Sequence, residues 1–223
     1  LSQLEKEGIV VRNHGGAMLA SNGLPRPFSY RSTDMREEKR QIAEAASSLL
    51  SDGSIIYLDT STTVICLIDY LTANKNITVI TNSLPAIQLL NNFGISVKCT
   101  GGDLNAESMG FIGHAAESYL AGVRTDFAFI STPAISLSGR ISDYSEQETY
   151  LRKVALANTS HSVFLFEKNK LNRDATFTLC SFRDVDYLIS NADIQSLFPN
   201  HTIKQRKYSG KKRQQSAYQK QPR

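Results

Sequence analysis

The stretch LDTSTTVICLIDYLTANKNITVITNS, from Leu58 to Ser83, decides the fold. It holds the end of an apolar strand, a polar loop, an amphipathic helix, and a second apolar strand that again runs into polar residues. Two strands joined by such a helix form a right-handed crossover, so both run in parallel and end at the same edge of a sheet. Open parallel α/β sheets bind their ligands in the crevice at that edge. The stretch therefore predicts an α/β fold with a ligand site beside two strand ends.

Small polar residues follow both strands. They are Asp59, Thr60, Ser61, Thr62 and Thr63 after the first strand, and Thr81, Asn82 and Ser83 after the second. Hydroxyl groups and the free backbone N–H groups of a helix N-terminus favour an anion such as phosphate, and the Asn82 amide offers a donor and an acceptor. Ser, Thr and Asn are also the preferred N-cap residues, so either cluster alone could serve only as a cap. The occurrence of two clusters on consecutive strand ends favours a binding site.

The chain continues this alternation on both sides of the stretch. A helix is expected from Met35 to about Leu50, with Asp34 as its cap. Further strands are expected at 54–58, 77–81, 95–100, 127–131, 162–166 and 186–190, and further helices at 62–72, 84–92, near 112–121 and at 145–158. Strands that alternate with helices of this length predict a mainly parallel open sheet with flanking helices, within one domain over residues 34–198.

Later loops add candidate ligand contacts. Gly101 and Gly102 follow a strand and would let the backbone approach a ligand, although a tight turn needs glycine equally. Asp143 or Glu148 could hydrogen-bond sugar hydroxyls, although a carboxylate in the first turn of a helix also complements its dipole. Lys170 follows another strand, where it could pair with phosphate or, if desolvated, act as a base. The sequence has no Gly-x-Gly-x-x-Gly motif after the first of these strands, so a dinucleotide cofactor is not expected.

Composition narrows the class of protein. Apolar residues make up 41% and charged residues 21% of the 223 residues, values typical of a globular protein. No apolar run reaches the roughly 20 residues that cross a bilayer, and the N-terminus does not resemble a signal peptide, which favours a cytoplasmic protein. The three cysteines lack a Cys-x-x-Cys pair, and the four histidines lack metal-ligand spacing. Neither a metal site nor a cofactor is therefore expected.

Residues 1–19 predict the end of a DNA-binding domain. The last turns of a helix lead into two short strands joined by a Gly-Gly turn. A winged helix-turn-helix ends in such a β-ribbon, or wing, and Arg12, Asn13 and His14 near its tip would then contact DNA phosphates. An exposed hairpin without this role is the alternative. Residues 20–33, rich in Pro, Gly and Asn, are expected to form a linker.

The C-terminal residues 199–223 differ in charge from the rest of the chain. The net charge is +4, but Lys204 to Arg223 holds 8 basic and no acidic residues, which leaves 17 basic and 21 acidic residues elsewhere. A block of one charge with Gln, Ser and Pro is typical of a disordered segment, and contact with nucleic acid is the alternative.

From Leu1 to about Ala192 the sequence resembles the DeoR family of bacterial transcriptional repressors. The end of that family's wing is similar to Arg12-Asn13-His14-Gly15-Gly16-Ala17, and its linker and first helix are similar to Pro27-Phe28, Arg31 and Glu38-Lys39 leading to Ile42-Ala43. Its ligand-binding motifs resemble the two polar clusters, the Gly101-Gly102 pair, Gly110 and Lys170. The sequence departs from the family at Ser61, where members often have Gly, at Thr132-Pro133-Ala134, where many have a Gly-rich turn, and at Glu167, where Asp is usual.

The resemblance implies a sensor domain with a fold like that of sugar-phosphate isomerases. Such a domain binds a phosphorylated sugar or a related metabolite at the residues named above and thereby changes the affinity of an oligomeric repressor for its operator DNA. The resemblance also implies that the DNA-recognition helices precede Leu1, so we expect the chain alone to bind DNA weakly.

Two other functions compete with this interpretation. An aldose–ketose isomerase would need a carboxylate base, which Asp143 or Glu148 could supply, with Lys170 and the hydroxyl loops holding phosphate. The sequence offers no convincing second acid or base for it, and a wing has no purpose in a small isomerase. A nucleic-acid-binding module that uses the basic C-terminal segment is the other alternative.

Overall fold

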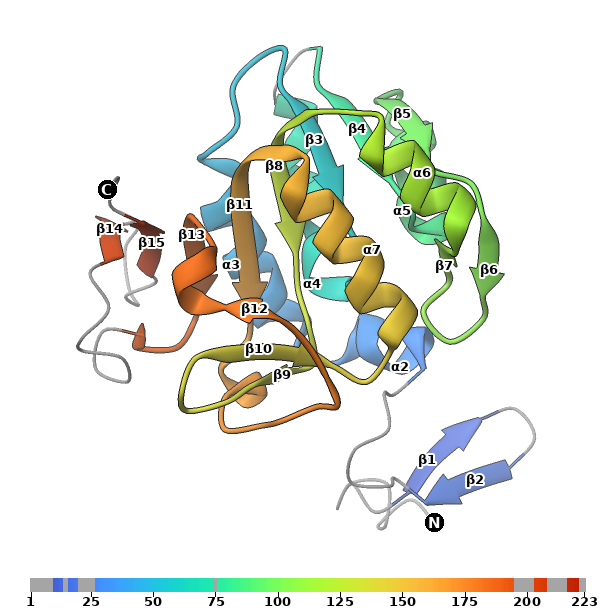
Figure 1. The fold of residues 1–223 in the computed structure, drawn as a ribbon, viewed down its shortest axis with the longest axis vertical. Helices are drawn as coiled ribbons and strands as arrows, with labels where there is room; N and C mark the ends of the chain where they lie inside the picture. The colour runs from blue at the N-terminus through green and yellow to red at the C-terminus, as the bar shows by residue number, and fades with distance from the viewer. Residues whose placement is uncertain are drawn as a thin grey trace.

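The computed structural model describes residues 10–13, 16–19, 27–73, 76–194, 203–207 and 216–220. Its main sheet consists of β3 (Ile55–Leu58), β4 (Thr78–Thr81), β5 (Ser96–Cys99), β8 (Thr125–Ile130), β11 (Thr159–Phe166), β13 (Tyr187–Ser190), β14 (Ile203–Lys207) and β15 (Ser216–Lys220). Their order across the sheet is β14-β15-β13-β11-β8-β3-β4-β5 (Figure 1). The six strands from β13 to β5 are parallel, and β15 and β14 are antiparallel at one edge. The predicted mainly parallel α/β sheet is thus confirmed.

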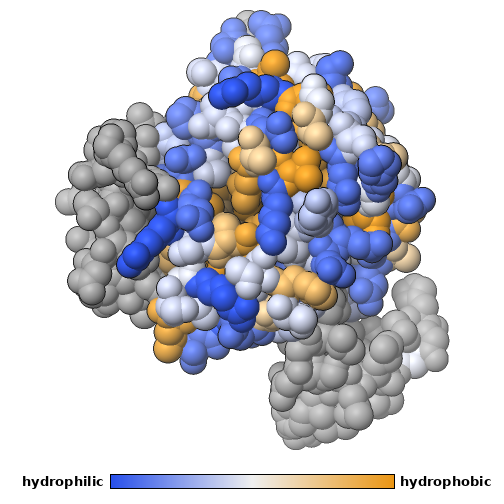
Figure 2. All heavy atoms as spheres, in the orientation of Figure 1, coloured by the Kyte–Doolittle hydropathy of each residue, from blue (hydrophilic) through white to orange (hydrophobic). Residues whose placement is uncertain are grey.

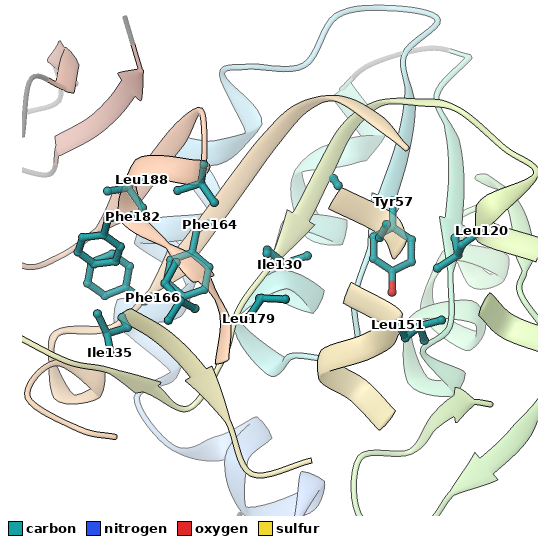
Figure 3. Close-up of a cluster of buried hydrophobic side chains, with 14 of the residues drawn as sticks. Tyr57, Leu120, Ile130, Ile135, Leu151, Phe164, Phe166, Leu179, Phe182 and Leu188 are labelled. Atoms are coloured by element: carbon teal, nitrogen blue, oxygen red, sulfur yellow. The ribbon is translucent and has the colours of Figure 1, made fainter. Parts of the chain in front are cut away.

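Helices cover both faces of this sheet. One face carries α6 (His114–Ala121) and α7 (Glu146–Ala157), and the other carries α3 (Arg36–Ser47), α4 (Thr62–Ile65), the 3-10 helix η1 (Cys66–Ala73) and α5 (Leu84–Asn92). Strand β3 alternates between the two cores, because successive side chains of a strand point to opposite faces. Tyr57 packs in one hydrophobic cluster with Leu120 and Leu151 (Figure 3), while Ile56 and Leu58 belong to the other cluster.

Shorter elements complete the fold, and the sequence did not predict them. Antiparallel strands β9 (Ala134–Ile135), β10 (Arg140–Asp143) and β12 (Phe177–Ser181) form a small sheet, and β6 (Asp103–Asn105) forms a hairpin with β7 (Gly110–Ile112). The 3-10 helices η2 (Lys168–Lys170) and η3 (Phe182–Asp184) follow β11 and β12. Segments of two to five residues are too short to show a clear hydrophobic period.

The expected linker over residues 20–33 needs a correction at its C-terminal end. Residues 28–33 form helix α2 (Phe28–Thr33), which begins after Pro27, a residue that suits a helix start because it has no N–H to leave unpaired. Asp34 is the C-cap of α2 and not the N-cap of the next helix, so the predicted cap is wrong. Helix α3 instead begins after Met35, which has a left-handed backbone with φ 51°.

The C-terminal segment also differs from the expected disorder where the structure describes it. Strands β14 and β15 pair with each other, and β15 pairs with β13. Without this pairing β13 would be an edge strand, whose unpaired backbone groups accept a further strand. The rest of the segment 199–223 lies outside the described residues.

The predicted N-terminal ribbon is present as two paired strands. Strand β1 (Val10–Asn13) pairs antiparallel with β2 (Gly16–Leu19), with Val10 opposite Leu19. His14 lies outside the described residues, as do the side chains of Arg12 and Asn13. Their contact with DNA therefore stays a prediction.

The surface shown in Figure 2 is mostly hydrophilic, with hydrophobic side chains visible between the polar ones. Within the described part of the chain, every helix is too short or too polar to pass through a lipid bilayer.

Candidate functional site

The order of the strands creates a site at the carboxyl edge of the sheet. From β3 the chain proceeds to β4 and β5 on one side, and from β8 it proceeds to β11 and β13 on the other. The ends of β3 and β8 are therefore neighbours at the point where the order reverses, which is where open α/β sheets bind ligands. Asp59, Asn82, Ser131 and Glu167 follow four of these strands, and all four are buried.

Asp59 joins the ends of β3 and β8. Its Oδ1 accepts a hydrogen bond from the Ser61 N–H at 2.9 Å, and its Oδ2 accepts one from the Ser131 N–H at 3.1 Å. Oδ2 also accepts a hydrogen bond from Nε of Arg152 at 2.9 Å. Asp59 therefore fixes the shape of the first polar loop through hydrogen bonds to Ser61, Ser131 and Arg152.

Two residues of the polar clusters do cap helices. The Ser61 hydroxyl accepts from the Val64 N–H at the start of α4, and the Ser83 hydroxyl accepts from the Ala86 N–H at the start of α5. Thr81 is also used internally, because its hydroxyl donates to the Leu58 carbonyl at 2.7 Å. Ser61 and Ser83 therefore act as helix caps, and a contact of either residue with a ligand stays a prediction.

Four buried residues form what we call the arginine cluster: Asp59, Asp143, Glu148 and Arg152. Nη1 of Arg152 donates to Oδ2 of Asp143 at 2.8 Å, and Nη2 donates to Oε2 of Glu148 at 3.0 Å. With the 2.9 Å bond from Nε to Asp59, the guanidinium binds three carboxylates through three different nitrogens. Asp143 and Glu148 do lie at the predicted site, but both are held by an arginine that the sequence analysis did not single out.

In the arginine cluster, burial and the neighbouring charges shift the pKa values of the side chains in opposite directions. Burial alone would lower the pKa of Arg152, but Asp143, Asp59 and Glu148 raise it well above its ordinary value. Burial raises the pKa of Asp143, although Arg152 acts in the opposite direction. Oε1 of Glu148 is buried and has no hydrogen-bond partner among the described residues. Among the carboxylate oxygens of the cluster, it is the one without a hydrogen bond in the described part of the chain.

A second ionic group, the lysine cluster, consists of Lys39, Glu167 and Lys170. Nζ of Lys170 lies 2.7 Å from Oε2 of Glu167 and donates to the hydroxyls of Ser131 at 2.8 Å and Thr63 at 3.2 Å. Nζ of Lys39 lies 3.8 Å from Oε1 of Glu167, which also accepts from the Thr63 hydroxyl at 3.0 Å. The predicted phosphate ligands Thr63 and Lys170 are thus in contact with each other.

The lysine cluster keeps its carboxylate ionised. Burial alone would raise the pKa of Glu167, but the charges of Lys170 and Lys39 hold it below its ordinary value. Burial lowers the pKa of Lys39. The charge of Glu167 raises this pKa, whereas the charge of Lys170 lowers it further. Two ammonium groups share a single carboxylate here, so the cluster has a positive charge in excess.

A narrow hollow lies beside the arginine cluster. Its walls come from the ends of β3 and β4 and from α7, and they are formed by Tyr57, Asp59, Thr60, Asn82, Glu148, Leu151 and Arg152. The Tyr57 hydroxyl donates to Oδ1 of Asn82 at 2.8 Å, and burial raises the pKa of Tyr57. As the structure stands, the hollow is too narrow to admit a water molecule.

The β6–β7 hairpin packs against the same loops. A Cβ atom on Gly110 would lie 2.2 Å from Cγ2 of Thr60, so only glycine allows this approach. The Phe111 N–H donates to the Asn82 carbonyl at 2.7 Å, and the Asn82 amide donates to the Phe111 carbonyl at 3.0 Å. The hairpin thus covers both predicted polar loops.

The Gly101-Gly102 pair has a packing role at its second position. A Cβ atom on Gly102, where φ is 113°, would lie 2.4 Å from the Ile112 carbonyl oxygen. Gly101, with φ 68°, faces open space. Position 102 therefore requires glycine because β7 lies too close for a side chain, and position 101 favours glycine because its backbone is left-handed.

The sequence located most of this site but missed several of its residues. Every polar residue of the two predicted clusters is buried at the strand ends, including Thr62 and Thr63 at the start of α4. Sequence reasoning missed Arg152, Ser131 and the ionic role of Lys39. The spacing of Arg152 four residues after Glu148 was a usable signal for an ion pair on α7. Within the described residues, the structure holds no group of three His, Cys, Asp or Glu that could bind a metal ion.

A parallel sheet with buried ionic groups at the reversal of its strand order defines an α/β domain built to bind a small molecule. Residues 34–192 of the chain match the family model described as the DeoR C terminal sensor domain. The chain therefore belongs to the DeoR family, and the domain that holds the site is a sensor domain.

Named relatives agree with this assignment. The HTH-type transcriptional repressor CsqR of Escherichia coli strain K12 is 29% identical over 192 residues, which cover 86% of this chain and 74% of the relative. The Glycerol-3-phosphate regulon repressor of the same organism is 26% identical, covering 86% and 77%. The regulator GolR of Listeria innocua is 31% identical, covering 87% and 77%. These relatives are transcriptional regulators and not enzymes, in agreement with the family assignment.

Solved structures share the fold at low sequence identity. A chain of the tetrameric eIF2B-beta2-delta2 complex from C. thermophilum has a TM-score of 0.51 and 14% identity, covering 69% of this chain and 55% of that chain. Ribose 5-phosphate isomerase A from Methanocaldococcus jannaschii has a TM-score of 0.46 and 15% identity, covering 82% and 79%. At these identities the likeness concerns the fold alone.

Proposed function

We propose that the sensor domain binds a phosphorylated sugar or a related phosphorylated metabolite, and that this effector changes the affinity of the full-length repressor for operator DNA. The observation that carries the proposal is the lysine cluster, where two ammonium groups share one carboxylate at the carboxyl edge of the sheet. An excess positive charge beside the hydroxyls of Thr63 and Ser131 suits a phosphate group.

The arginine cluster suits the other end of such an effector. It has three carboxylates for one guanidinium, and the buried Oε1 of Glu148 is an acceptor for a hydroxyl group. Asn82 and Thr60 line the hollow beside the arginine cluster and would contact the same molecule. A compound with phosphate at one end and hydroxyls at the other therefore matches the polarity of the site.

The names of relatives point to the same class of compound. One relative is the Glycerol-3-phosphate regulon repressor of Escherichia coli, and another is the Lactose phosphotransferase system repressor of Staphylococcus epidermidis. Glycerol 3-phosphate and phosphorylated sugars are therefore the first compounds to test. We further propose that the regulator is a cytoplasmic homo-oligomer whose wing residues Arg12, Asn13 and His14 contact DNA.

Isothermal titration with these phosphate esters, and with the same sugars lacking phosphate, tests the proposal. We expect at least one ester to bind and its unphosphorylated counterpart to bind far more weakly. The variant Lys170→Met should weaken binding of that ester by at least about tenfold, the cost of one charge-assisted hydrogen bond. Lys168→Met removes an exposed lysine of the same short helix and should leave the affinity unchanged. Equal affinity in both variants would contradict the assignment of Lys170.

The alternative of a sugar-phosphate isomerase is not supported by the geometry of its proposed base. Asp143 and Glu148 both form ion pairs with the buried Arg152, so each carboxylate already has a structural role in the arginine cluster.

A further inference from the structure

Helix α2 is held to the sensor domain largely by polar contacts. None of its six residues is fully buried, although Phe28 and Tyr30 are half-buried. Burial lowers the pKa of Arg31, which the nearby carboxylates of Glu148, Asp59 and Asp143 oppose, so this side chain also connects α2 with the arginine cluster. The Phe28 N–H, at its start, donates to the Glu107 carbonyl at 3.2 Å. At its end, Nζ of Lys39 donates to the Arg31 carbonyl and, at 2.7 Å, to the Asp34 carbonyl. A buried ammonium group thus binds the C-terminal carbonyls of α2, where the helix dipole favours a cation.

Lys39 connects α2 with the proposed phosphate site. Its side chain is only 6% exposed and lies between the carbonyls of α2 and Glu167. Its distance of 3.8 Å to Oε1 of Glu167 is longer than a hydrogen bond, whereas Lys170 lies at 2.7 Å from Oε2. In this state Glu167 takes Lys170 as its close partner, and Lys39 binds α2.

We propose that Lys39 transmits the occupancy of the site to helix α2. An anion that binds Lys170 draws this lysine away from Glu167, Glu167 then takes Lys39 as its close partner, and α2 loses the ammonium group that binds its last carbonyls. The identity of the anion rests on the function proposed above, while the exchange of partners rests on the geometry of these three residues.

The exchange follows from the charges of the cluster. A buried carboxylate that loses its nearest cation is costly to leave unpaired, so it draws in the remaining one. A shift of about 1 Å by Lys39 brings it into hydrogen-bond range of Glu167. Helix α2 lies in sequence between the β1–β2 ribbon and the sensor domain, so loosening it changes the segment that joins them.

Hydrogen–deuterium exchange of the protein without ligand tests directly whether Glu167 switches its partner from Lys170 to Lys39. Lys170→Met leaves Glu167 without its close cation, so we expect the amides of residues 31–34 to exchange about tenfold faster, although Lys170 does not contact α2 in the structure. Adding Glu167→Gln to that variant removes the charge that attracts Lys39 and should restore the slow exchange of the wild type. A merely structural effect of losing Lys170 would not be reversed in this way.

Lys39→Met should release α2 by the same factor, with no further change when Lys170→Met is added. Arg36→Met, which alters an exposed residue one turn earlier on α3, is the matched control and should leave α2 unchanged.

Amides of β3 and β8 report whether each variant is folded. If Lys170→Met speeds amide exchange in those strands, Lys39→Met is the variant that tests the proposal. The proposal is overturned if Lys170→Met or Lys39→Met leaves the amide exchange of α2 unchanged while the sheet is intact. It is also overturned if adding Glu167→Gln to Lys170→Met does not restore slow exchange in α2. Failure of the phosphate esters to bind would instead count only against the proposed function.

Discussion

The arginine cluster and the lysine cluster lie at the same edge of the sheet, and they differ in which charge predominates among their members. Carboxylates outnumber cations in the first, near which Arg31 of α2 adds a further positive charge, whereas ammonium groups outnumber carboxylates in the second. In the arginine cluster three carboxylates surround one guanidinium at 2.8–3.0 Å, and the Arg152 side chain is 5% exposed. In the lysine cluster two ammonium groups share Glu167, and the Lys170 side chain is 17% exposed. The first cluster is enclosed, whereas the second reaches towards solvent.

This difference indicates which part of the site is a rigid framework and which part could rearrange its contacts when a ligand binds. Arg152 joins α7, β10 and the loop after β3, so its bonds set the relative position of three elements. Lys170 binds two hydroxyls and one carboxylate, and a phosphate group could replace any of these acceptors. The arginine cluster therefore holds the site in shape, and the lysine cluster is suited to respond to a ligand.

Removing the central cation of the framework should have the largest effect. Arg152→Met leaves three buried carboxylates without their shared cation, so we expect the free energy of unfolding to fall by about 3–5 kcal/mol, as is typical when one partner of a buried ion pair is lost. Urea unfolding measures this change. Lys153→Met alters the exposed neighbour on the same helix and should change stability by less than about 0.5 kcal/mol. Similar values for both variants would mean that the arginine cluster is not a framework.

Removing one of the three carboxylates should cost less. Asp143→Asn keeps the shape of the side chain and leaves two carboxylates to balance Arg152, and burial already raises the pKa of Asp143. We expect a loss of about 1–2 kcal/mol from the weakened hydrogen bonds to Arg152 and to the Ser145 N–H. The same urea experiment measures it, and a loss equal to that of Arg152→Met would show that the carboxylates do not share the guanidinium.

The smallest effect should appear in the response to acid. The folded-state pKa of Glu167 is lowered, so its ionisation stabilises the fold above the unfolded pKa of about 4.3, and this contribution is lost as the pH falls through the folded value. Glu167→Gln should therefore make stability less sensitive to acid below about pH 4.3. The pKa of Asp143 is raised, so its protonation favours the folded state as the pH falls, and Asp143→Asn should make acid sensitivity greater. Unfolding curves at several pH values compare the two, and shifts in the same direction would contradict the contrast between the clusters.

Regular alternation of apolar strands and helices made the main sheet predictable. Helix 84–92 has the bounds that the sequence indicated, and β3, β4 and β13 begin within one residue of the expected strands. Helix α2 was missed because it has no apolar stripe, and the small antiparallel sheet was missed because β9 and β10 are very short. Local pattern predicts an element only where one of its faces enters a core.

The candidate site was predictable in position but not in its internal bonds. Strand ends rich in hydroxyls located it, because parallel strands end at one edge. The partner of Asp59, however, is Arg152, which lies 93 positions further along the chain, and the partner of Lys170 is shared with Lys39 on a different helix. Which of several nearby charges pair in a buried site depends on side-chain geometry that no local spacing encodes.

The narrowness of the hollow beside Thr60 would limit the affinity for any ligand that enters it. Because the hollow beside Thr60 is too narrow for a water molecule, a ligand that enters it would bind only those molecules in which the walls of the hollow have moved apart. The apparent dissociation constant then equals the intrinsic one divided by the open fraction, so a site open about 1% of the time binds about 100-fold more weakly than a permanently open one. If the proposed effector enters this hollow, the concentration at which the sensor responds would depend on how often these walls move apart, and not only on the contacts of the bound state.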